Sequence, residues 1–539
     1  MTCYGLSCFL FVLPHFLISP YSVSGGVDFD ETCTGAISSY SPNCESNAEL
    51  TYISIFFISI TVMAVASSTS FCLGITFIHD NSEPDLVPKY VGIFIGSMAF
   101  GPAIGFVLGG IFLNHFVNPS ISTDMTPMSS AWVGQWWPGF FILGFLLCFF
   151  SSFFYIFPRN LNGTIRQKKQ QQHKLELQTT STIIDASLKG VVFSLLSNKS
   201  FLCVSFAGAF GSYVTVGFGN FLPKVLESQF SLTASSASLY AGALLVLGVL
   251  TGIVIGSIIS KKWSNLQIIR KSTFLIMLST IFGLAFMVHC EPLSLAGVNA
   301  NYPAVNASDF IPYITNNTQT SLTASCNSNC NCKSSVMAPV CIEGITYFNP
   351  CYGGCSQRVH LTDATTAYSN CSCAQQSGVD ARASNSNFTA TGGICSSSCP
   401  GKFALFFFLL FLFLVLMFMT TVPLTNFTLA ILPERHRTFG MGCASFVNTM
   451  VGAFPGPLVV GALFDRDCVL WEETCGANRG ACWLYDSNRL SSDLLVLLFV
   501  AKGIVITLLF GAWKWYTLPE KEEEEDEGQP DSMQDESAF

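Results

Sequence analysis

The feature that most constrains this chain is a series of long apolar runs separated by polar segments. A helix that crosses a lipid bilayer needs about 20 mostly apolar residues, and a helix satisfies its own backbone hydrogen bonds there. The runs have about that length, so the sequence predicts an all-α polytopic membrane protein. The predicted spans are Cys3–Ile18, Thr51–Ile78, Val91–Val117, Trp136–Phe157, Phe201–Leu222, Ala237–Ile259, Thr273–His289, Phe403–Leu432, Phe439–Leu463 and Leu494–Trp515.

Composition supports this class and excludes others. Only 11% of the residues are charged, whereas soluble domains have about 25%. A large part of the net charge of −9 comes from the tail Glu520–Glu536, which we interpret as cytosolic. Basic residues are few, so nucleic acid is not an expected partner. The stretch Met1–Ser19 lacks a basic n-region and is predicted to be a span rather than a cleaved signal.

The distribution of Lys and Arg predicts an orientation, because cytosolic loops are enriched in both residues. With the N-terminus inside, Arg159–Lys199, Lys261–Lys271 and Glu434–Arg437 become cytosolic. The opposite side then holds Tyr21–Leu50, Asn118–Gly134, Lys224–Ser236, Cys290–Lys402 and Asp465–Asp493. We therefore expect a multi-pass protein of the plasma membrane with both termini in the cytosol.

The outer segment Cys290–Lys402 resembles a small secreted domain in its cysteine content. Besides Cys290 it has an even number of cysteines, which predicts five disulfides of undetermined connectivity in an oxidising compartment. These are Cys326, Cys330, Cys332, Cys341, Cys351, Cys355, Cys371, Cys373, Cys395 and Cys399. Zinc binding is the competing interpretation, but an extracellular location disfavours it, and no metal site is predicted. The predicted glycosylation sites are Asn306, Asn316, Asn370 and Asn387.

Two smaller outer segments carry further cysteines. Cys33 and Cys44 can close a hairpin bridge, whereas Cys468, Cys475 and Cys482 form an odd set. Within the long segment, the pattern Pro339-Val-Cys-x-x-Gly-x-x-Tyr-x-x-x-Cys-x-x-x-Cys resembles a Kazal-type module. We assign this module to residues 326–399 and expect a bridged cap with a small apolar core and no inhibitory role.

Three predicted spans carry glycine at every fourth position, which lets helix backbones approach closely in lipid. Static packing explains a single stripe, whereas recurrence in both halves of the chain favours duplicated bundles with a binding site between them. The glycines are Gly101, Gly105 and Gly109, then Gly248, Gly252 and Gly256, and then Gly452 and Gly456.

The predicted division follows from these features. The N-terminal transmembrane half is 1–158, the cytosolic linker 159–199, and the first part of the C-terminal half 200–289. The extracellular loop is 290–402, the remainder of the C-terminal half 403–516, and the acidic cytosolic tail 517–539.

The segment Trp132-Val-Gly134-Gln-Trp136-Trp137-Pro-Gly139-Phe140 resembles the signature of the organic anion transporting polypeptides. Further matches are Leu13-Pro-His15-Phe16, Leu222-Pro-Lys224-x-x-Glu227, the Kazal-like loop and Cys468–Tyr485. The resemblance covers nearly the whole chain. It implies a major-facilitator-like bundle of twelve helices in two halves. It also implies transport of amphipathic organic anions, such as bile salts, steroid conjugates, thyroid hormones and prostanoids, without sodium or ATP.

The sequence departs from the family pattern in three places. The span Cys3–Ile18 corresponds to the third helix of the family, so the first two helices are expected to be lacking. Ser129, Ser130 and Ala131 precede Trp132, where the family has an acidic residue and an arginine. In relatives, the span that corresponds to the ninth span of this chain often carries an arginine, where this chain has Thr449. Anion recognition by that span is therefore in doubt.

Ionisable residues at membrane depth are candidates for substrate binding. Lys224 matches a family position tied to substrate handling, although it could instead snorkel or pair with Glu227. Lys502 lies mid-span, where it faces a cavity or a partner. His15 could titrate near physiological pH or act structurally.

Aromatic residues complete the candidate set. Trp132, Trp136 and Trp137 form either an interfacial belt or a stacking surface at an outer gate. Tyr213 and Tyr240 could line an amphipathic pocket or pack in a core.

No P-loop or catalytic motif occurs, so neither an enzyme nor a cofactor is predicted. The expected partners are the lipid bilayer and small amphipathic organic anions. The terminus Glu536-Ser537-Ala538-Phe539 resembles a PDZ-domain ligand. The alternative function is a membrane protein that does not transport and uses the cysteine module for adhesion or protease binding.

Overall fold

The computed structural model describes most of the chain. The described residues are 1–17, 32–33, 47–82, 86–119, 132–154, 188–302, 322–332, 337–360, 366–374, 390–395, 399–432, 437–473 and 479–516. Outside them lie Cys44, Cys475, Asn306, Asn316, Asn387 and Phe539.

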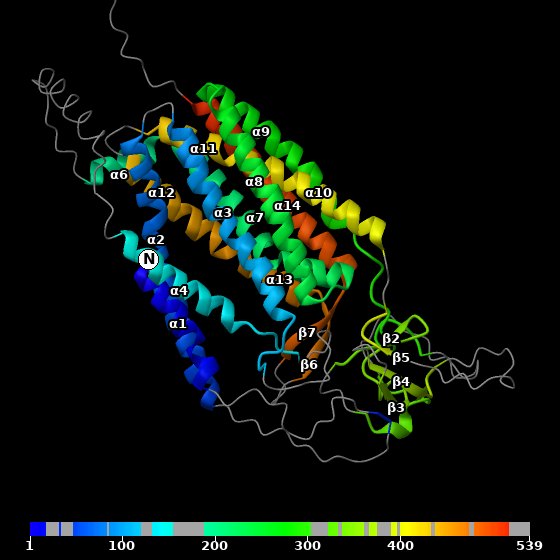
Figure 1. Cartoon of the computed structure of the whole chain (residues 1–539). Coiled ribbons are helices and arrows are strands. Elements are labelled where there is room, and N and C mark those ends of the chain that lie inside the picture. The colour runs from blue at the N-terminus through cyan, green and yellow to red at the C-terminus, as the bar shows by residue number, and fades with distance from the viewer. Residues whose placement is uncertain are drawn as a thin grey trace, which may run out of the picture.

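Helices fall into an N-terminal and a C-terminal group. The first contains α1 (Thr2–Leu17), α2 (Asn47–Asn81), α3 (Val87–Leu113) and α4 (Trp137–Phe154). After α6 (Leu188–Ser197), the second contains α7 (Lys199–Phe230), α8 (Ala234–Ser260), α9 (Asn265–Phe282) with η1 (Gly283–Met287), α10 (Pro400–Met419), α11 (Thr421–Ala430), α12 (Arg437–Val447), η4 (Asn448–Ala453), α13 (Pro455–Arg466) and α14 (Ser487–Trp515). In Figure 1, α1 and α4 stand apart from α7 and α14, while α3 lies beside α8 and makes the main contact between the groups.

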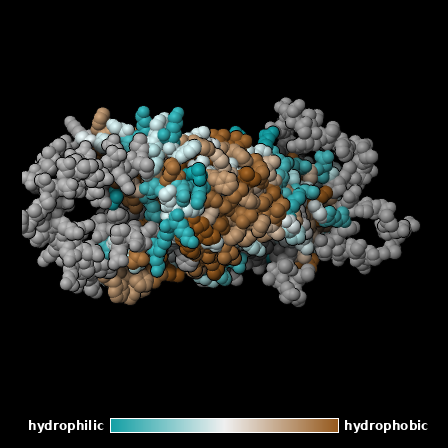
Figure 2. Space-filling view, turned by 90° about the horizontal axis from the view of Figure 1, so that it is seen from above, coloured by the Kyte–Doolittle hydropathy of each residue, from teal (hydrophilic) through white to brown (hydrophobic). Residues whose placement is uncertain are grey.

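Seven segments of the described chain are long and apolar enough to cross a membrane. They are Trp137–Phe154, Lys199–Phe230, Ala234–Ser260, Asn265–Met287, Pro400–Ala430, Phe439–Arg466 and Ser487–Trp515. Each overlaps one predicted span. The other three predicted spans fall on α1, α2 and α3, which contain the shorter apolar stretches Thr2–Leu17, Thr51–Ala66 and Ile104–Leu113. Figure 2 shows hydrophobic side chains across the middle of the visible face, with hydrophilic ones on either side, as expected for a protein in a bilayer.

Short polar side chains determine where several helices begin. Asn198 Oδ1 accepts a hydrogen bond from the backbone N–H of Phe201 at 3.0 Å, and Thr233 Oγ1 accepts one from Ser236 at 3.2 Å. Such bonds satisfy N–H groups that have no partner in the first turn. Between α7 and α8, Ser231 adopts a left-handed conformation with φ of 53° and reverses the chain.

Two spans are not continuous α-helices. The span Pro400–Ala430 is divided at Thr420, where Pro423 has no N–H to donate to the carbonyl of Met419. The span Phe439–Arg466 contains the π-helical segment η4 immediately before Pro455. Wide turns of this kind allow a helix to change direction within the membrane.

Glycines of two stripes lie at close helix contacts. A Cβ atom built on Gly252 of α8 would lie 2.6 Å from the carbonyl oxygen of Val415 in α10. One built on Gly456 of α13 would lie 2.7 Å from the carbonyl oxygen of Tyr213 in α7. Gly248 and Gly256 contact α10 as well, and Gly452 contacts α7. These helix pairs therefore approach as the stripes predict.

The stripe of α3 behaves differently. No described atom lies within 4 Å of a Cβ built on Gly101, Gly105 or Gly109, so the predicted packing role of these three residues is wrong for the described part of the chain. The close approach is made instead by Gly110, where a Cβ would lie 2.8 Å from Leu239 Cγ of α8. The reason is that α8 faces the neighbouring position of the same helix.

The segment that is predicted to lie outside, which we call the outer segment, folds around a small antiparallel sheet. Its strands are β1 (Val340–Ile342), β2 (Ile345–Tyr347), β3 (Cys355–His360), β4 (Thr366–Cys371) and β5 (Ala390–Gly392), in the order β2-β1-β5-β4-β3. Asn370, a predicted glycosylation site, is exposed in β4. That the fold is of the Kazal type stays a prediction.

Seven disulfides are present among the described residues. They join Cys33–Cys330, Cys290–Cys399, Cys326–Cys373, Cys332–Cys351, Cys341–Cys395, Cys355–Cys371 and Cys468–Cys482.

This pairing corrects two predictions. The Cys33–Cys44 hairpin bridge is wrong, because Cys33 bonds to Cys330, with the Cα atoms 4.6 Å apart. The ten loop cysteines do not form five bridges among themselves, because Cys399 bonds to Cys290. Sequence spacing favours local pairs, whereas the fold brings distant segments together.

A second sheet connects the outer segment to the bundle. Strands β6 (Cys468–Glu473) and β7 (Arg479–Tyr485) form a hairpin between α13 and α14. Leu484 of the hairpin packs with Leu295, Phe348 and Tyr352, and the Phe348 and Trp483 rings lie 5.2 Å apart. The disulfide-bonded segment therefore rests on the loop that joins the last two spans.

Candidate functional site

The outer end of α7 presents Lys224 beside a carboxylate and an aromatic ring. Its Nζ lies 3.1 Å from Glu227 Oε1, and both side chains are 36% exposed. The same Nζ lies 5.4 Å from the ring centroid of Tyr485. The pairing with Glu227 that the sequence left open is thus present, and the ammonium still reaches solvent.

Tyr485 lies between this charged group and two phenylalanine rings. Its ring packs against Phe464 at 5.4 Å, and Phe464 stacks on Phe221 at 5.3 Å. Burial raises the pKa of the Tyr485 phenol to about 12, and the carboxylates of Glu227 and Asp465 add to the shift. The phenol therefore stays neutral at physiological pH. One cation above stacked rings provides complementary contacts for both ends of an amphipathic anion.

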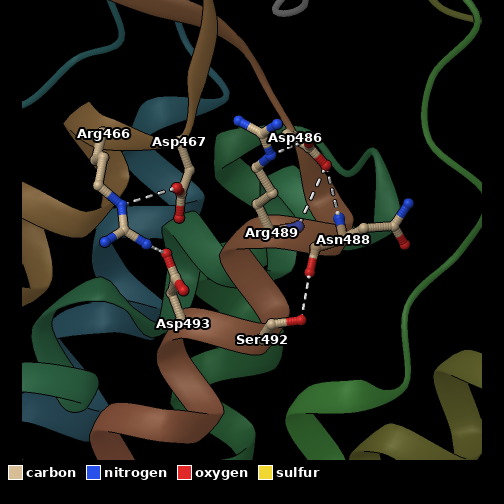
Figure 3. Close-up of polar contacts among 7 residues, drawn as sticks. All are labelled: Arg466, Asp467, Asp486, Asn488, Arg489, Ser492 and Asp493. Atoms are coloured by element: carbon tan, nitrogen blue, oxygen red, sulfur yellow. Dashed lines mark hydrogen bonds and ion pairs between the residues drawn. The ribbon is translucent and has the colours of Figure 1, made fainter.

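A second charged cluster lies at the start of α14 (Figure 3). Arg466 of α13 forms an ion pair with Asp493 of α14, and its Nε lies 3.4 Å from Asp467 Oδ1. Asp467 is buried, and its Oδ2 has no hydrogen-bond partner among the described residues. This cluster ties the outer ends of α13 and α14 together.

Asp486 completes the cluster by capping α14. Its Oδ1 accepts hydrogen bonds from the backbone N–H groups of Asn488 and Arg489 at 3.1 and 3.2 Å. The sequence reasoning missed these acidic and basic residues. The available signal was their concentration on both sides of the Cys468–Tyr485 hairpin.

Lys502 lies in the middle of α14 and is 2% exposed. Its Nζ is 5.2 Å from the ring centroid of Phe413 in α10. Among the described residues no carboxylate pairs with it. The C-terminal group therefore holds an inward-facing amine with no carboxylate partner in the described part of the chain, and a positive charge there would be costly at membrane depth.

The N-terminal group gathers an aromatic cluster where α1 ends and α4 begins. His15 stacks on Trp137 at 5.0 Å and meets Trp136 edge-on at 6.0 Å. The Phe11 and Trp136 rings meet edge to face, with their centroids 6.0 Å apart. These residues pack together as one surface at the outer end of the two helices.

Two of the tryptophans also hold the turn after α3. Trp132 Nε1 donates to the carbonyl of Leu113 at 3.0 Å, and Trp137 Nε1 donates to that of Val117 at 3.4 Å. These bonds favour a structural role for both indoles, whereas Trp136 packs against the rings of Phe11, His15 and Phe56.

The two candidate tyrosines lie in packing positions. The Tyr213 carbonyl is where Gly456 approaches α7. Tyr240 is 41% exposed and packs against Phe403 and Phe407 at 5.1 and 6.5 Å. The structure therefore brings Lys224 together with Tyr485 rather than with Tyr213 or Tyr240. His15 and the tryptophans stand apart from this group, on α1 and α4 (Figure 1).

Sequence comparison finds relatives along nearly the whole chain. The family model described as "Organic Anion Transporter Polypeptide (OATP) family" matches residues 1–490. Solute carrier organic anion transporter family member 4C1 of Rattus norvegicus is 31% identical, over 94% of this chain and 70% of its own length. Member 4A1 of Mus musculus is 29% identical, over 96% and 71%.

Among solved structures, a bacterial homolog of the human lysosomal transporter Spinster matches 95% of this chain and 80% of its own. Its TM-score of 0.44 and identity of 11% are too low to bear on the argument. The family match alone confirms the predicted class, a helical membrane transporter of the major-facilitator-like type. The chain belongs to the Organic Anion Transporter Polypeptide family.

Proposed function

We infer that this protein moves amphipathic organic anions across the plasma membrane by alternating access, without sodium. The inferred substrates have an anionic group and a rigid apolar body, as steroid sulfates and bile salts do. The observation that carries this inference is Lys224, whose half-exposed ammonium stands over the Tyr485 ring and the Phe464–Phe221 stack.

An arriving anion would compete with Glu227 for the ammonium. The Lys224–Glu227 pair is exposed enough for water to weaken it, so exchange of one carboxylate for a substrate sulfate costs little. Rearrangement of α7 against α13 and α14 would then accompany the change of access, because substrate can shift only those conformations that it binds differently.

The proposed orientation places both termini in the cytosol and the five-stranded sheet outside. It is supported by the disulfides of the outer segment, which are typical of an oxidising compartment. It is also supported by Lys89 of α3 and Lys261 after α8, which lie at the ends of these helices away from the sheets. Selective labelling of a cysteine introduced at position 262, with and without permeabilisation, tests the orientation.

The function is tested by uptake of labelled estrone sulfate or taurocholate into cells that express the chain. Lys224→Ala should raise the KM for uptake roughly fivefold, because a partly exposed ion pair is worth about 1 kcal/mol. Lys224→Arg should retain most of the uptake. The matched control is Lys402→Ala, which removes an exposed lysine at the same end of the bundle.

Two results would contradict the proposal. Uptake no greater than in mock-transfected cells, despite surface expression, would favour a protein that does not transport. Unchanged kinetics of Lys224→Ala would remove this residue from substrate recognition.

A further inference from the structure

A groove of about 680 Å³ runs between α3 and α8 at the end of both helices that lies away from the sheets. We call it the α3–α8 groove. Its apolar lining includes Ile93, Leu250, Val254 and Ile258, and its charged lining consists of Lys89 and Lys261. No part of the proposed anion site at Lys224 contributes to it.

Two glycines of α3 create the groove. A Cβ built on Gly92 would collide with the Ser257 side chain of α8, and one on Gly96 would lie 3.8 Å from Ile253 Cγ2. The helices therefore nearly touch along this line, and the larger side chains on either side of it form the walls. Because the walls come from helices of different groups, the groove straddles the main contact between the two groups.

No described residue covers the apolar wall. Ile93 is 60% exposed, Val254 56% and Ile258 60%. Within a membrane-spanning region, lipid acyl chains cover such surface. A groove between two helices binds one acyl chain at a defined position, whereas a convex surface offers no defined position for a single acyl chain.

The charged end of the groove carries two cations and, among the described residues, no anion. Lys89 lies in the first turn of α3, and Lys261 follows the last residue of α8, so both belong to the same end. No carboxylate among the described residues pairs with either ammonium, and no acidic side chain lines the groove. Lysines at such a position extend along apolar surface and place their ammonium groups at the headgroup level.

We propose that the α3–α8 groove is a binding site for an anionic phospholipid of the cytosolic leaflet, with phosphatidylserine as the simplest representative. One acyl chain lies along Ile93, Val254 and Ile258, and the headgroup lies between Lys89 and Lys261. Charge complementarity selects this occupant, since basic pockets between helices on the cytosolic side suit anionic headgroups. The leaflet assignment rests on the orientation given under Proposed function, whereas the binding itself does not.

The site gives the lipid a physical influence on transport. A ligand that contacts both α3 and α8 favours the conformation in which these helices are close. The free energy of this shift equals the difference between the ligand's binding free energies for the two conformations. Anionic lipid would therefore stabilise the conformation in which this end of the bundle is closed.

The test measures binding of spin-labelled phosphatidylserine to the purified full chain in phosphatidylcholine vesicles. Spin-labelled phosphatidylcholine in the same vesicles gives the non-specific level. In Lys89→Gln/Lys261→Gln the preference for phosphatidylserine should fall roughly 25-fold, because each lysine near an anionic headgroup is worth about a factor of five. Lys262→Gln is the matched control, since it removes the neighbouring lysine that does not line the groove.

A second variant, Val254→Trp, fills the groove without changing charge and should displace the lipid as well. Melting temperatures of the variants, measured in phosphatidylcholine alone, establish that each is folded. Equal phosphatidylserine preference in the wild type and in both variants would overturn the proposal. So would displacement of the lipid from the wild type by estrone sulfate, because the groove would then be a substrate site. Lipid binding without any estrone sulfate uptake would support the lipid site and refute only the proposed function.

Discussion

The close contact of α8 with α10 predicts a sharp difference between two glycine-to-alanine substitutions. In Gly252→Ala the new methyl carbon would lie 2.6 Å from Val415 O, 3.0 Å from Phe418 Cβ and 3.1 Å from Met419 N. Ordinary contacts begin at 3.4 Å. Two of these three atoms belong to the backbone, so α10 itself must move by several tenths of an ångström.

Forcing an extra methyl group into a packed contact costs about 1–3 kcal/mol. Alanine is the better helix former by about 1 kcal/mol, which offsets part of this cost but leaves the variant less stable. In Gly219→Ala of α7 no described atom lies within 4 Å of the new carbon, so only the gain in helix propensity remains.

Melting temperatures of detergent-purified protein, followed by fluorescence-detected size exclusion, distinguish the two variants. Gly252→Ala should melt below the wild type, and Gly219→Ala at or above it. If both variants melted at the wild-type temperature, the α8–α10 contact would not have the geometry described, and the reasoning from glycine stripes would fail.

Three further predictions concern the outer face. Arg466→Asp should slow uptake and lower the melting temperature, because it leaves the buried Asp467 carboxylate without its cationic neighbour, and adding Asp493→Arg should restore part of both; strictly additive losses would argue against the pair. Peptide mapping without reduction should recover Cys33 linked to Cys330, and recovery of an unlinked Cys33 peptide would contradict the bridge. Trp483→Ala removes the aromatic contact between hairpin and outer sheet and should lower the biotinylated surface fraction at constant total expression; an unchanged fraction would mean that this docking is dispensable.

The spans could be predicted from the sequence because hydropathy reports directly on burial in lipid. The breaks within them could not. The division at Thr420 precedes Pro423, and the π-helical turns of η4 precede Pro455. Both prolines were visible in the sequence. Whether a proline merely tilts a helix or divides it depends on what its neighbours supply, and hydropathy carries no information about that.

The glycine stripes show a similar limit. Gly252 and Gly105 have the same four-residue spacing, yet only Gly252 meets a neighbouring helix among the described residues. A glycine stripe establishes that one face of a helix carries no bulky side chains. Which helix covers that face, and at which register, is decided by the whole bundle.

Long-range pairs were the least accessible from sequence. Cys33 and Cys330 are 297 positions apart, and Arg466 and Asp493 are separated by the entire β6–β7 hairpin. No spacing rule selects such partners. Lys224 was found because it lies near a span end and matches a family position, and both features can be read from a short stretch of sequence.

The Cys33–Cys330 bridge raises the question of whether it restrains the two helix groups against each other. Cys33 stands between Leu17, the last residue of α1, and Asn47, the first residue of α2. The bridge therefore attaches the outer segment to the chain that joins the first two helices of the N-terminal group. The same segment contacts the C-terminal group through Phe348 and Trp483 and through the Cys290–Cys399 bridge, so it links the outer ends of both helix groups.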